Sequence, residues 1–436
     1  MKTFKKKQFL SKSRKMAIVI FAVIFVFGTA NAQTEQSKQK SFPAQVSIFY
    51  PLGTHGWESA DYTYNFSLNL MHGKVGGING LEISGFVGRV YGNVYGTQVA
   101  GFVNTTENVT GIQVAGLVNT SNNMNGIQVA GLVNTTNNVI GTQIAGLVNA
   151  SDDVIGIQVA GLVNASDTVG GIQIAGLVNA ADVVKGIQIG GLLSLSRCLQ
   201  GIQIGGLGNE ACCVRGIQIG GLNIACNYLK GMQIALTNFA DTVKGGLQIG
   251  TFNRTQTLRG LQIGLVSVND TIESGGSLSL VNIVRRGFYR SWEVSVADYS
   301  NLAVTYRMGT RTLYTIYTVG ANFIEDNLWN VGIGFGHRRA INNNLDFRPE
   351  IVSYNYFPMD FRNIQSTFST HLKFGFVYNV SENFGISLTP SVFALNSRRN
   401  SDTEHYRVSP ISPFYTREKN NWQTAIGAGI SLGINF

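Results

Sequence analysis

A pattern of apolar and polar positions repeats every 15 residues through the middle of the chain. The unit Gly126–Ile140 has the sequence GIQVAGLVNTTNNVI, in which Gln128 separates two apolar neighbours and Gly131 interrupts the apolar run. Alternation with period two predicts a short strand, and the polar segment Thr135–Asn138 predicts a turn. A fixed period of this kind indicates a stacked repeat architecture. The opening glycine recurs at residues 96, 111, 126, 141, 156, 171, 186, 201, 216, 231 and 246, with weaker copies at 80, 260 and 275.

Two all-β architectures fit this repeat. In a β-solenoid each unit forms one coil, and equivalent residues of successive coils stack about 4.8 Å apart. In the alternative, each unit is one barrel strand with its turn, and neighbouring strands run antiparallel. The constant period, the recurring glycines and the lack of aromatic residues from Val103 to Asn227 favour the solenoid, because membrane barrels carry aromatic girdles. The solenoid predicts two amide ladders, one of glutamines (98, 113, 128, 143, 158, 173, 188, 203, 218, 233 and 248) and one of asparagines (104, 119, 134, 149, 164 and 179).

Alternating, aromatic-rich segments flank the repeats. Before them, Ala44–Leu52 and Thr63–Met71 predict two strands, which we interpret as a cap on one end of the solenoid. After them, the pattern predicts an antiparallel transmembrane β-barrel of about eight strands. In its final strand, apolar residues from Trp422 to Phe436 occupy one face, and small or polar residues occupy the other. The predicted strands are 288–299, 301–308, 313–323, 328–338, 345–357, 368–380, 384–395 and 422–436.

The last strand also carries a recognisable ending. It closes on Gly433-Ile434-Asn435-Phe436, and this ending resembles the C-terminal signal of outer-membrane β-barrel proteins. The resemblance implies that the barrel-assembly machinery inserts the chain into outer-membrane lipid. It assigns the insertion signal to the apolar face of this strand, namely Trp422, Ile430, Leu432, Ile434 and Phe436.

The N-terminus has the pattern of a secretory signal peptide. Residues 1–32 hold seven lysines and arginines and no acid, which accounts for most of the net charge of +9. The apolar run Ala17–Gly28 is too short to span a bilayer, and Ala30-Asn31-Ala32 predicts cleavage after Ala32. The expected domains are a signal peptide (1–32), a polar linker (33–43), N-terminal strands (44–79), the repeat region (80–284) and the barrel (285–436).

The repeat resembles the short surface repeat of outer-membrane and surface proteins of diderm bacteria. The shared unit is GxQxxGLxN, as in Gly111–Asn119, and the resemblance extends from Gly80 to Asn282. It implies a location in the cell envelope. It transfers no catalytic residue and no cofactor to this chain.

Two features of the repeats are candidates for chemistry. A basic row precedes the repeat glycine in the later units, and it is a candidate anion-binding stripe for groups such as lipid phosphates. Cys198 and Cys213 lie one repeat apart, so stacked coils predict a disulfide between them. An ordinary solvated turn is the alternative explanation of the basic row. The members of the basic row are Lys185, Arg215, Lys230, Lys244 and Arg259.

The barrel region offers one candidate catalytic pair. Ser369 and His371 share a strand face, which permits contact between a nucleophile and a base. They faintly resemble the His-x-Ser of outer-membrane phospholipases, but the order is reversed and the pair is expected to face the lumen rather than lipid. A polar lumen lining is therefore the favoured interpretation. The sequence contains no metal-ligand spacing, phosphate loop or nucleotide fingerprint, and we expect no enzyme activity, cofactor or nucleic-acid partner.

These observations predict a non-enzymatic repeat protein of the outer membrane or cell envelope. Its repeats would present a structural or binding surface to a surface or periplasmic ligand that the sequence does not identify. The alternative is a large outer-membrane channel or transport protein in which the repeats are barrel strands.

Overall fold

The computed structural model describes residues 40–323, 327–360, 367–381, 384–398, 408–409, 411–419 and 421–436. The predicted signal peptide and most of the polar linker lie outside these residues. The described chain is almost entirely β-structure. It divides into two compact units, Met1–Cys226 and Asn227–Phe436, so the division falls inside the repeat region. Each unit is described separately below.

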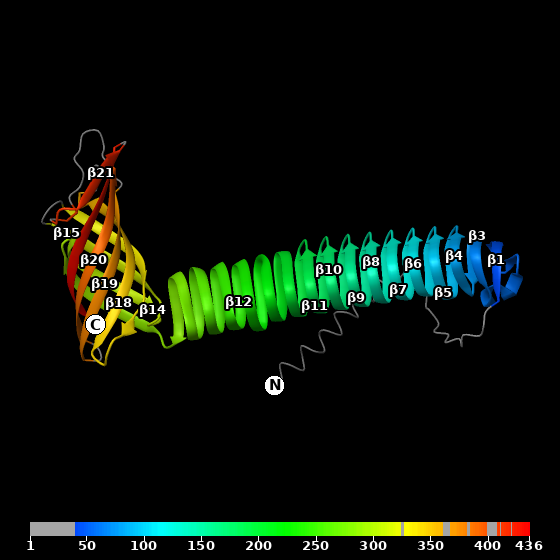
Figure 1. Ribbon diagram of the computed structural model, residues 1–436, viewed down its shortest axis with the longest axis horizontal. Coiled ribbons are helices and arrows are strands. Elements are labelled where there is room, and N and C mark those ends of the chain that lie inside the picture. The colour runs from blue at the N-terminus through cyan, green and yellow to red at the C-terminus, as the bar shows by residue number, and fades with distance from the viewer. Residues whose placement is uncertain are drawn as a thin grey trace. The chain divides into compact units, whose positions relative to one another are not determined.

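The first unit is a parallel β-solenoid. Each 15-residue repeat forms one coil, and Figure 1 shows β5 to β11 as successive coils of one winding. Neighbouring strands are parallel, and equivalent residues such as Gln113 and Gln128 pair directly. The strands are β5 (Val87–Ala100), β6 (Val103–Ala115), β7 (Val118–Ala130), β8 (Val133–Ala145), β9 (Val148–Ala160), β10 (Val163–Ala175), β11 (Val178–Gly190) and the start of β12 (Leu193–Arg286). The solenoid prediction is confirmed, and the alternative of barrel strands is wrong because barrel neighbours would be antiparallel.

Each coil has a largely polar interior. In the coil Gly126–Ile140, the buried side chains are Gln128, Ala130, Asn134, Thr136 and Val139. Of the larger aliphatic positions, only that of Val139 forms a continuous buried row. Its equivalents are Val94, Val109, Met124, Val154, Val169, Val184, Leu199 and Val214, each no more than 2% exposed. The other aliphatic rows of the repeat face outward, and they are considered below.

The repeat glycine is required by both backbone conformation and space. Gly126 has φ +138°, a region that residues with a side chain seldom adopt. A Cβ atom at Gly126 would lie 2.0 Å from the carbonyl oxygen of Gly111 on the preceding coil. The same contact recurs from coil to coil, because each glycine stacks on the last one. Close approach of the backbones therefore explains why this position stays glycine in unit after unit.

The two predicted N-terminal strands extend the same stack. β1 (Ser41–Phe49) pairs in parallel with β3 (Thr63–Val75), β3 pairs in parallel with β4 (Gly77–Ser84), and β4 pairs in parallel with β5. The short strand β2 (Leu52–Gly53) and the 3-10 helix η1 (Gly56–Asp61) lie between β1 and β3 in the chain. The segment predicted as a cap therefore consists of irregular coils of the solenoid itself.

The second unit ends in a closed antiparallel barrel of eight strands. Consecutive strands pair as antiparallel neighbours, and β13 pairs with β22 to close the barrel. Figure 1 shows this barrel in yellow-green to red. The strands are β13 (Tyr289–Ala297), β14 (Ser300–Gly309), β15 (Tyr314–Asn322), β16 (Leu328–Gly336), β18 (Leu345–Pro358), β19 (Thr367–Ser381), β20 (Phe384–Arg398) and β22 (Trp422–Asn435), with short β17 (Arg339–Ala340) and β21 (Tyr415–Lys419) beside β18 and β22. All eight strands predicted for this region are confirmed.

Within the second unit, the last coil of β12 contacts the start of β15. Asn282 Nδ2 donates a 2.8 Å hydrogen bond to Thr315 Oγ1, and this hydroxyl donates to the carbonyl oxygen of Ser279 at 2.7 Å. Thr312 Oγ1 donates to the carbonyl oxygen of Gly275 at 3.3 Å. Buried side-chain hydrogen bonds therefore connect the end of the repeat region to the barrel.

Candidate functional site

The glutamines of the repeat form a buried ladder in the first unit. Each Nε2 donates to Oε1 of the glutamine one coil earlier, with distances of 2.8 Å for Gln113 to Gln98 and 2.7 Å for Gln128 to Gln113. Hydroxyls also donate to these oxygens, as Thr106 does to Gln98 at 2.6 Å. These glutamines are completely buried. Their polar groups are therefore satisfied by one another, as burial of amides demands.

The asparagines form a second ladder that also supports the backbone. Asn119 Nδ2 donates to Oδ1 of Asn134 at 3.0 Å and to the carbonyl oxygen of Val129 at 2.7 Å. The second bond satisfies the backbone carbonyl group of Val129, two residues before the bend at Gly131. Both predicted ladders therefore form inside the coils, where they hold the bends and fix the register of each coil on the next.

The glutamine ladder of the first unit begins on a carboxylate. Glu82 pairs with Gln98 in the stack, and its Oε2 accepts from Gln98 Nε2 at 2.8 Å. Its Oε1 accepts from Asn69 Nδ2 at 3.1 Å and from Ser84 Oγ at 3.5 Å. Burial raises the pKa of Glu82 to about 7, although the three donors oppose this shift. Glu82 is the end residue toward which the amide donors of the ladder point.

In the second unit the ladder ends on donors. Gln248 donates to Gln233, and Gln262 donates to Gln248, both at 2.7 Å. Within the described part of the chain, Oε1 of Gln262 accepts from no further glutamine. It accepts instead from Ser277 Oγ at 2.8 Å and from Asn269 Nδ2 at 2.9 Å. These glutamine amides therefore direct their nitrogen toward the chain's N-terminus, as those of the first unit do, whereas the amides of the asparagine ladder direct theirs toward the C-terminus.

The basic row is exposed but not uniformly available to an anion. All five predicted residues lie on the surface, Lys185 and Arg215 in the first unit and the others in the second. Lys244 Nζ lies 4.9 Å from the centre of the Tyr228 ring, and Arg259 forms an ion pair with Glu273. Anion binding by Lys185, Arg215, Lys230, Lys244 and Arg259 stays a prediction.

The cysteine pairing differs from the expected one. The structure contains a disulfide between Cys212 and Cys226, and Cys198 and Cys213 are free thiols. Burial, with a smaller contribution from the neighbouring Cys213, raises the pKa of Cys198. The stacking that motivated the prediction is therefore present, but the bond lies elsewhere. One coil is locally short here, because Asn209 bonds to Asn223 over 14 residues rather than 15. This shift brings Cys226 beside Cys212, with Cα atoms 4.3 Å apart.

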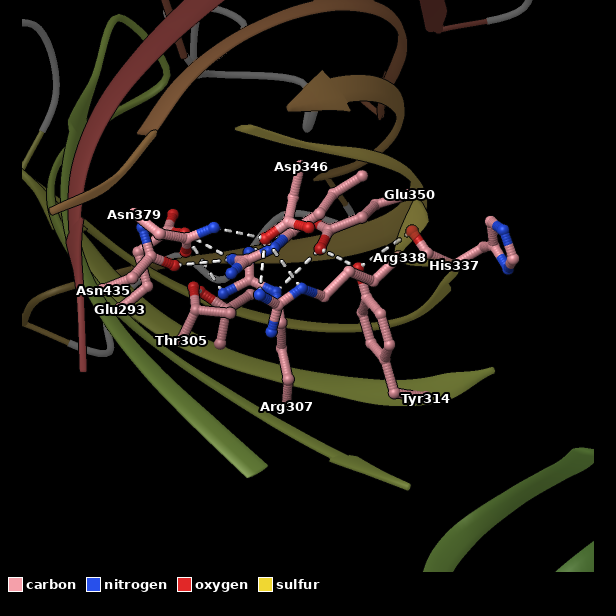
Figure 2. Close-up of polar contacts among 12 residues, drawn as sticks. Glu293, Thr305, Arg307, Tyr314, His337, Arg338, Asp346, Glu350, Asn379 and Asn435 are labelled. Carbon is pink, nitrogen blue, oxygen red and sulfur yellow. Dashed lines mark hydrogen bonds and ion pairs between the residues drawn. The ribbon is translucent and has the colours of Figure 1, made fainter. Parts of the chain in front are cut away.

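The barrel interior contains a buried network of ion pairs (Figure 2). Arg307 binds Glu350 through two hydrogen bonds of 2.7 and 3.2 Å, and its Nη1 lies 3.2 Å from Glu293. Tyr314 donates to Glu350 at 2.8 Å, and Arg348 donates to Asn435 at 2.6 Å. Two guanidinium groups and two carboxylates thus balance each other in the lumen. Such a cluster is tolerated where water is excluded because each charge has partners.

The lumen is filled by side chains along its length. Near one end, Asp346 accepts from Arg338 and from Asn379, the latter at 2.7 Å (Figure 2). Large aromatic side chains such as Tyr354 and Tyr356 are also completely or almost completely buried. Eight-stranded barrels have interiors just wide enough for side chains. This barrel matches that description and has a packed interior.

Ser369 and His371 are in contact, as their spacing allowed. Ser369 Oγ lies 2.8 Å from His371 Nε2, and Tyr356 Oη lies 3.0 Å from Ser369 Oγ. His371 is completely buried, and its Nδ1 has no hydrogen-bond partner among the described residues. The imidazole is instead packed between aromatic rings, with the Phe393 centre 5.0 Å away. The pair faces the lumen, as predicted, and this arrangement gives a substrate no access.

Comparisons with known proteins give no assignment. The chain matches no protein-family model, no curated protein and no solved structure. Within the described residues there is no group of three or more histidine, cysteine or acidic side chains that could hold a metal ion. No helix in that same part of the chain is both long and apolar enough to cross a membrane.

Sequence reasoning missed Glu82 and the pairing of the lumen charges. A signal for Glu82 was present, since the weak copy that begins at Gly80 has glutamate where other copies have glutamine. Arg307 and Glu350 lie at inward positions of strands in which outward apolar and inward polar residues alternate, so this alternation predicts that both side chains are buried. It does not predict their mutual contact, because they come from β14 and β18, which are not neighbours in the barrel.

Proposed function

We propose that this chain is a non-enzymatic protein of the bacterial outer membrane, in which the barrel is an anchor and the solenoid presents a surface. The observation that carries the proposal is the division of β22 into two faces. Ile430, Leu432 and Ile434 face outward, whereas Ser431 and Gly433 are buried in the lumen. Outward aliphatic residues around a polar interior are typical of transmembrane barrels.

Aromatic pairs at the two ends of β22 support the same proposal. Trp422 packs against Phe368 with ring centres 6.3 Å apart, and Phe436 packs against Phe384 at 6.0 Å. Fourteen residues of strand cover roughly 46 Å, which a tilt of about 45° reduces to roughly 33 Å. This span fits the hydrocarbon layer with an aromatic girdle at each interface.

Membrane fractionation of the full chain, expressed in a diderm host, tests the proposal. We expect the protein in the outer-membrane fraction and resistant to extraction with alkaline carbonate. Phe436→Ala should reduce the inserted amount, because Phe436 belongs to the predicted insertion signal. Tyr415→Ala is the matched control, since Tyr415 is an exposed aromatic residue of the short β21. Recovery of the wild-type chain as a soluble protein after export would disprove the anchor.

The channel alternative loses its structural premise. It required the repeats to be barrel strands, and they form parallel coils instead. The barrel that is present has eight strands, and buried ion pairs and aromatic side chains occupy its lumen. We therefore expect planar bilayers that contain the purified protein to stay sealed, and steady single-channel conductance would contradict the anchor function.

A further inference from the structure

The outer surface of the solenoid carries a continuous aliphatic face. We define the aliphatic face by the positions of Ile127, Val129, Leu132 and Val133 in the six coils from Gly111 to Gln200. The side chains at these positions project outward, and Ile127 is 45% exposed whereas its neighbour Gln128 is completely buried. The most exposed members are Ile112, Leu117, Ile127, Leu132, Ile144, Leu147, Ile157, Leu162, Ile174, Leu177, Ile189 and Leu192.

This distribution is the reverse of that in a water-soluble protein. Amides and hydroxyls fill most of the coil, and branched aliphatic side chains cover part of its outside. Six coils at about 4.8 Å spacing make a strip roughly 30 Å long, and the chain from Ile127 over the bend at Gly131 to Val133 gives it a width of about 20 Å, on the order of 600 Å². The largest exposed apolar patch on a typical monomer is about 300–600 Å² and is often functional. A surface at the top of this range is a candidate contact site for an apolar partner.

Charge is excluded from the same part of each of these six coils. In the six coils, the nine residues that open each repeat include no charged side chain, as in Gly126–Asn134. All the charges lie in the remaining six residues of each repeat, and these are Asp152, Asp153, Asp167, Asp182, Lys185 and Arg197. The coils are therefore asymmetric across their section, with an uncharged aliphatic side and a turn side that carries all the charges and also the exposed Ile140 and Ile155.

We propose that the aliphatic face lies in the surface layer of a lipid bilayer, in contact with acyl chains. This inference rests on the proposed function, because the barrel anchor supplies the nearby membrane. Amphipathic elements bind in this manner when one face is apolar and the other is polar. The backbone can enter an apolar phase, since each coil's peptide groups pair with those of the coils on either side.

Lipid fits this surface better than a folded partner does. Rows of equivalent residues recur at every coil, so a rigid partner could shift by one coil and find the same surface again. Protein interfaces obtain their specificity from aromatic and arginine anchors, and the aliphatic face has neither. Acyl chains are fluid and require no register. The charges of these six coils are mostly acidic, so neutral phospholipid is the appropriate probe.

Fluorescence quenching by lipid tests the proposal on the full chain in phosphatidylcholine vesicles. The background Cys198→Ser/Cys213→Ser retains the disulfide and removes both thiols. A single environment-sensitive fluorophore is then attached to Ile127→Cys on the aliphatic face, or to Asn137→Cys on the exposed turn of the same coil. We expect lipids brominated in their acyl chains to quench most of the emission at position 127 and to leave position 137 unchanged.

A label at Ile430→Cys separates this inference from the anchor proposal. Ile430 lies on the outward face of the barrel and should be quenched in any inserted protein. Quenching at 430 without quenching at 127 would overturn the inference and leave the anchor intact. No quenching at 430 would disprove the anchor, and the inference with it. If position 127 is shielded from aqueous iodide but not quenched by brominated lipid, a protein covers the face and the lipid assignment is wrong.

A second variant guards against disturbance by the label. Thr142 occupies the row of Ile127 in the native chain, so threonine fits there without loss of fold. We expect Ile127→Thr/Ile157→Thr/Ile172→Thr to retain its circular dichroism spectrum and to lose most lipid quenching of a label at Leu132→Cys. Unchanged quenching in this variant would show that the aliphatic row does not determine lipid contact.

Discussion

Nε2 of Gln98 donates a 2.8 Å hydrogen bond to Oε2 of Glu82, so the buried amide ladder of the first unit begins on an acidic side chain. The direction of the ladder explains this placement. From Gln113 to Gln218, each ladder glutamine directs its NH₂ group toward the preceding coil, and the NH₂ group of the first glutamine, Gln98, therefore needs an acceptor. Both oxygens of an ionised carboxyl group accept hydrogen bonds, and a protonated carboxyl group keeps a carbonyl oxygen that accepts.

Glu82 makes the stability of the first coils depend on pH. Its pKa is raised to about 7 in the folded protein, from 4.5, so the folded state binds the proton more tightly than the unfolded state. The resulting stabilisation is complete below pH 4.5 and is lost as pH rises to about 7, by about 3 kcal/mol. Hydrogen exchange of β4 and β5 at pH 5 and pH 7.5 measures it after correction for intrinsic exchange rates. Glu82→Gln should abolish this dependence and the exposed Glu107→Gln should not, and equal dependence in all three proteins would contradict the assignment.

The repeat glycine should not tolerate a side chain. Gly126→Ala places a Cβ atom 2.0 Å from the Gly111 carbonyl oxygen at φ +138°, so we expect a loss of several kcal/mol or failure to fold. Gly170 is the matched control, because its nearest contact would be 3.6 Å from Val154 and its φ is ordinary. Urea unfolding followed by circular dichroism compares them. Equal midpoints for the two alanine variants would refute the close-approach explanation.

Interior and exterior glutamines should respond differently to substitution. Gln128→Leu removes the acceptor of Gln143 and the donor to Gln113, so two buried amides lose a partner at a cost of about 1–3 kcal/mol each. Gln200 lies on the surface, and Gln200→Leu should change stability by less than about 0.5 kcal/mol. Urea midpoints measure both effects. A stabilised Gln128→Leu protein would show that the amides are not needed for stacking.

Ion pairs in the barrel and on the coil surface offer another matched test. Arg307→Leu removes the ion-pair partner of Glu350 and leaves Glu293 with Arg348 alone, 3.9 Å away, so we expect a loss of about 3–5 kcal/mol. Arg285→Leu breaks an exposed pair with Asp270 at 3.3 Å, for which we expect about 0–1 kcal/mol. Unfolding in detergent measures the two changes. If Arg307→Leu costs no more than Arg285→Leu, the lumen must admit enough water to solvate both glutamates.

The disulfide assignment is open to direct chemical mapping. Alkylation without reduction, followed by digestion and mass spectrometry, should label Cys198 and Cys213 and recover Cys212 linked to Cys226. Closing a loop of about 15 residues contributes roughly 3 kcal/mol, so Cys212→Ser/Cys226→Ser should lower stability. Cys198→Ser/Cys213→Ser should have a much smaller effect. Recovery of a linked peptide with Cys198 and Cys213 would restore the original expectation and disprove the present pairing.

The architecture was predictable because local and periodic signals agreed. Alternation around Gln128, the bend at Gly131 and the constant period indicated stacked coils, and eight alternating segments indicated the barrel. Features that depend on how coils or strands align with one another could not be predicted from the sequence. The pairing of Cys212 with Cys226 follows from one short coil, and a constant period of 15 cannot reveal that shift. The contact between Arg307 and Glu350 depends on how the barrel closes, which no single strand encodes.

The orientation of the aliphatic rows was also hidden from pattern analysis. Alternation shows that Ile127 and Gln128 face opposite sides, but it does not say which side is interior. Hydropathy alone would bury the isoleucine, whereas the structure buries the glutamine. The ladder favours the orientation with glutamine inside, because an amide inside the stack forms hydrogen bonds to an identical amide on each neighbouring coil. A single strand shows no such neighbour.

Equivalent residues pair coil upon coil, and this has a consequence for how such a gene can change. A duplication or deletion of 45 nucleotides adds or removes one whole coil, and every junction that remains is the same as before. Coils one residue shorter or longer keep the glutamine ladder, as the 14-residue step from Gln248 to Gln262 and the 16-residue step from Glu82 to Gln98 show. The reach of the repeat region is therefore a quantity that evolution can adjust in steps of about 4.8 Å, without new packing and without change to the barrel.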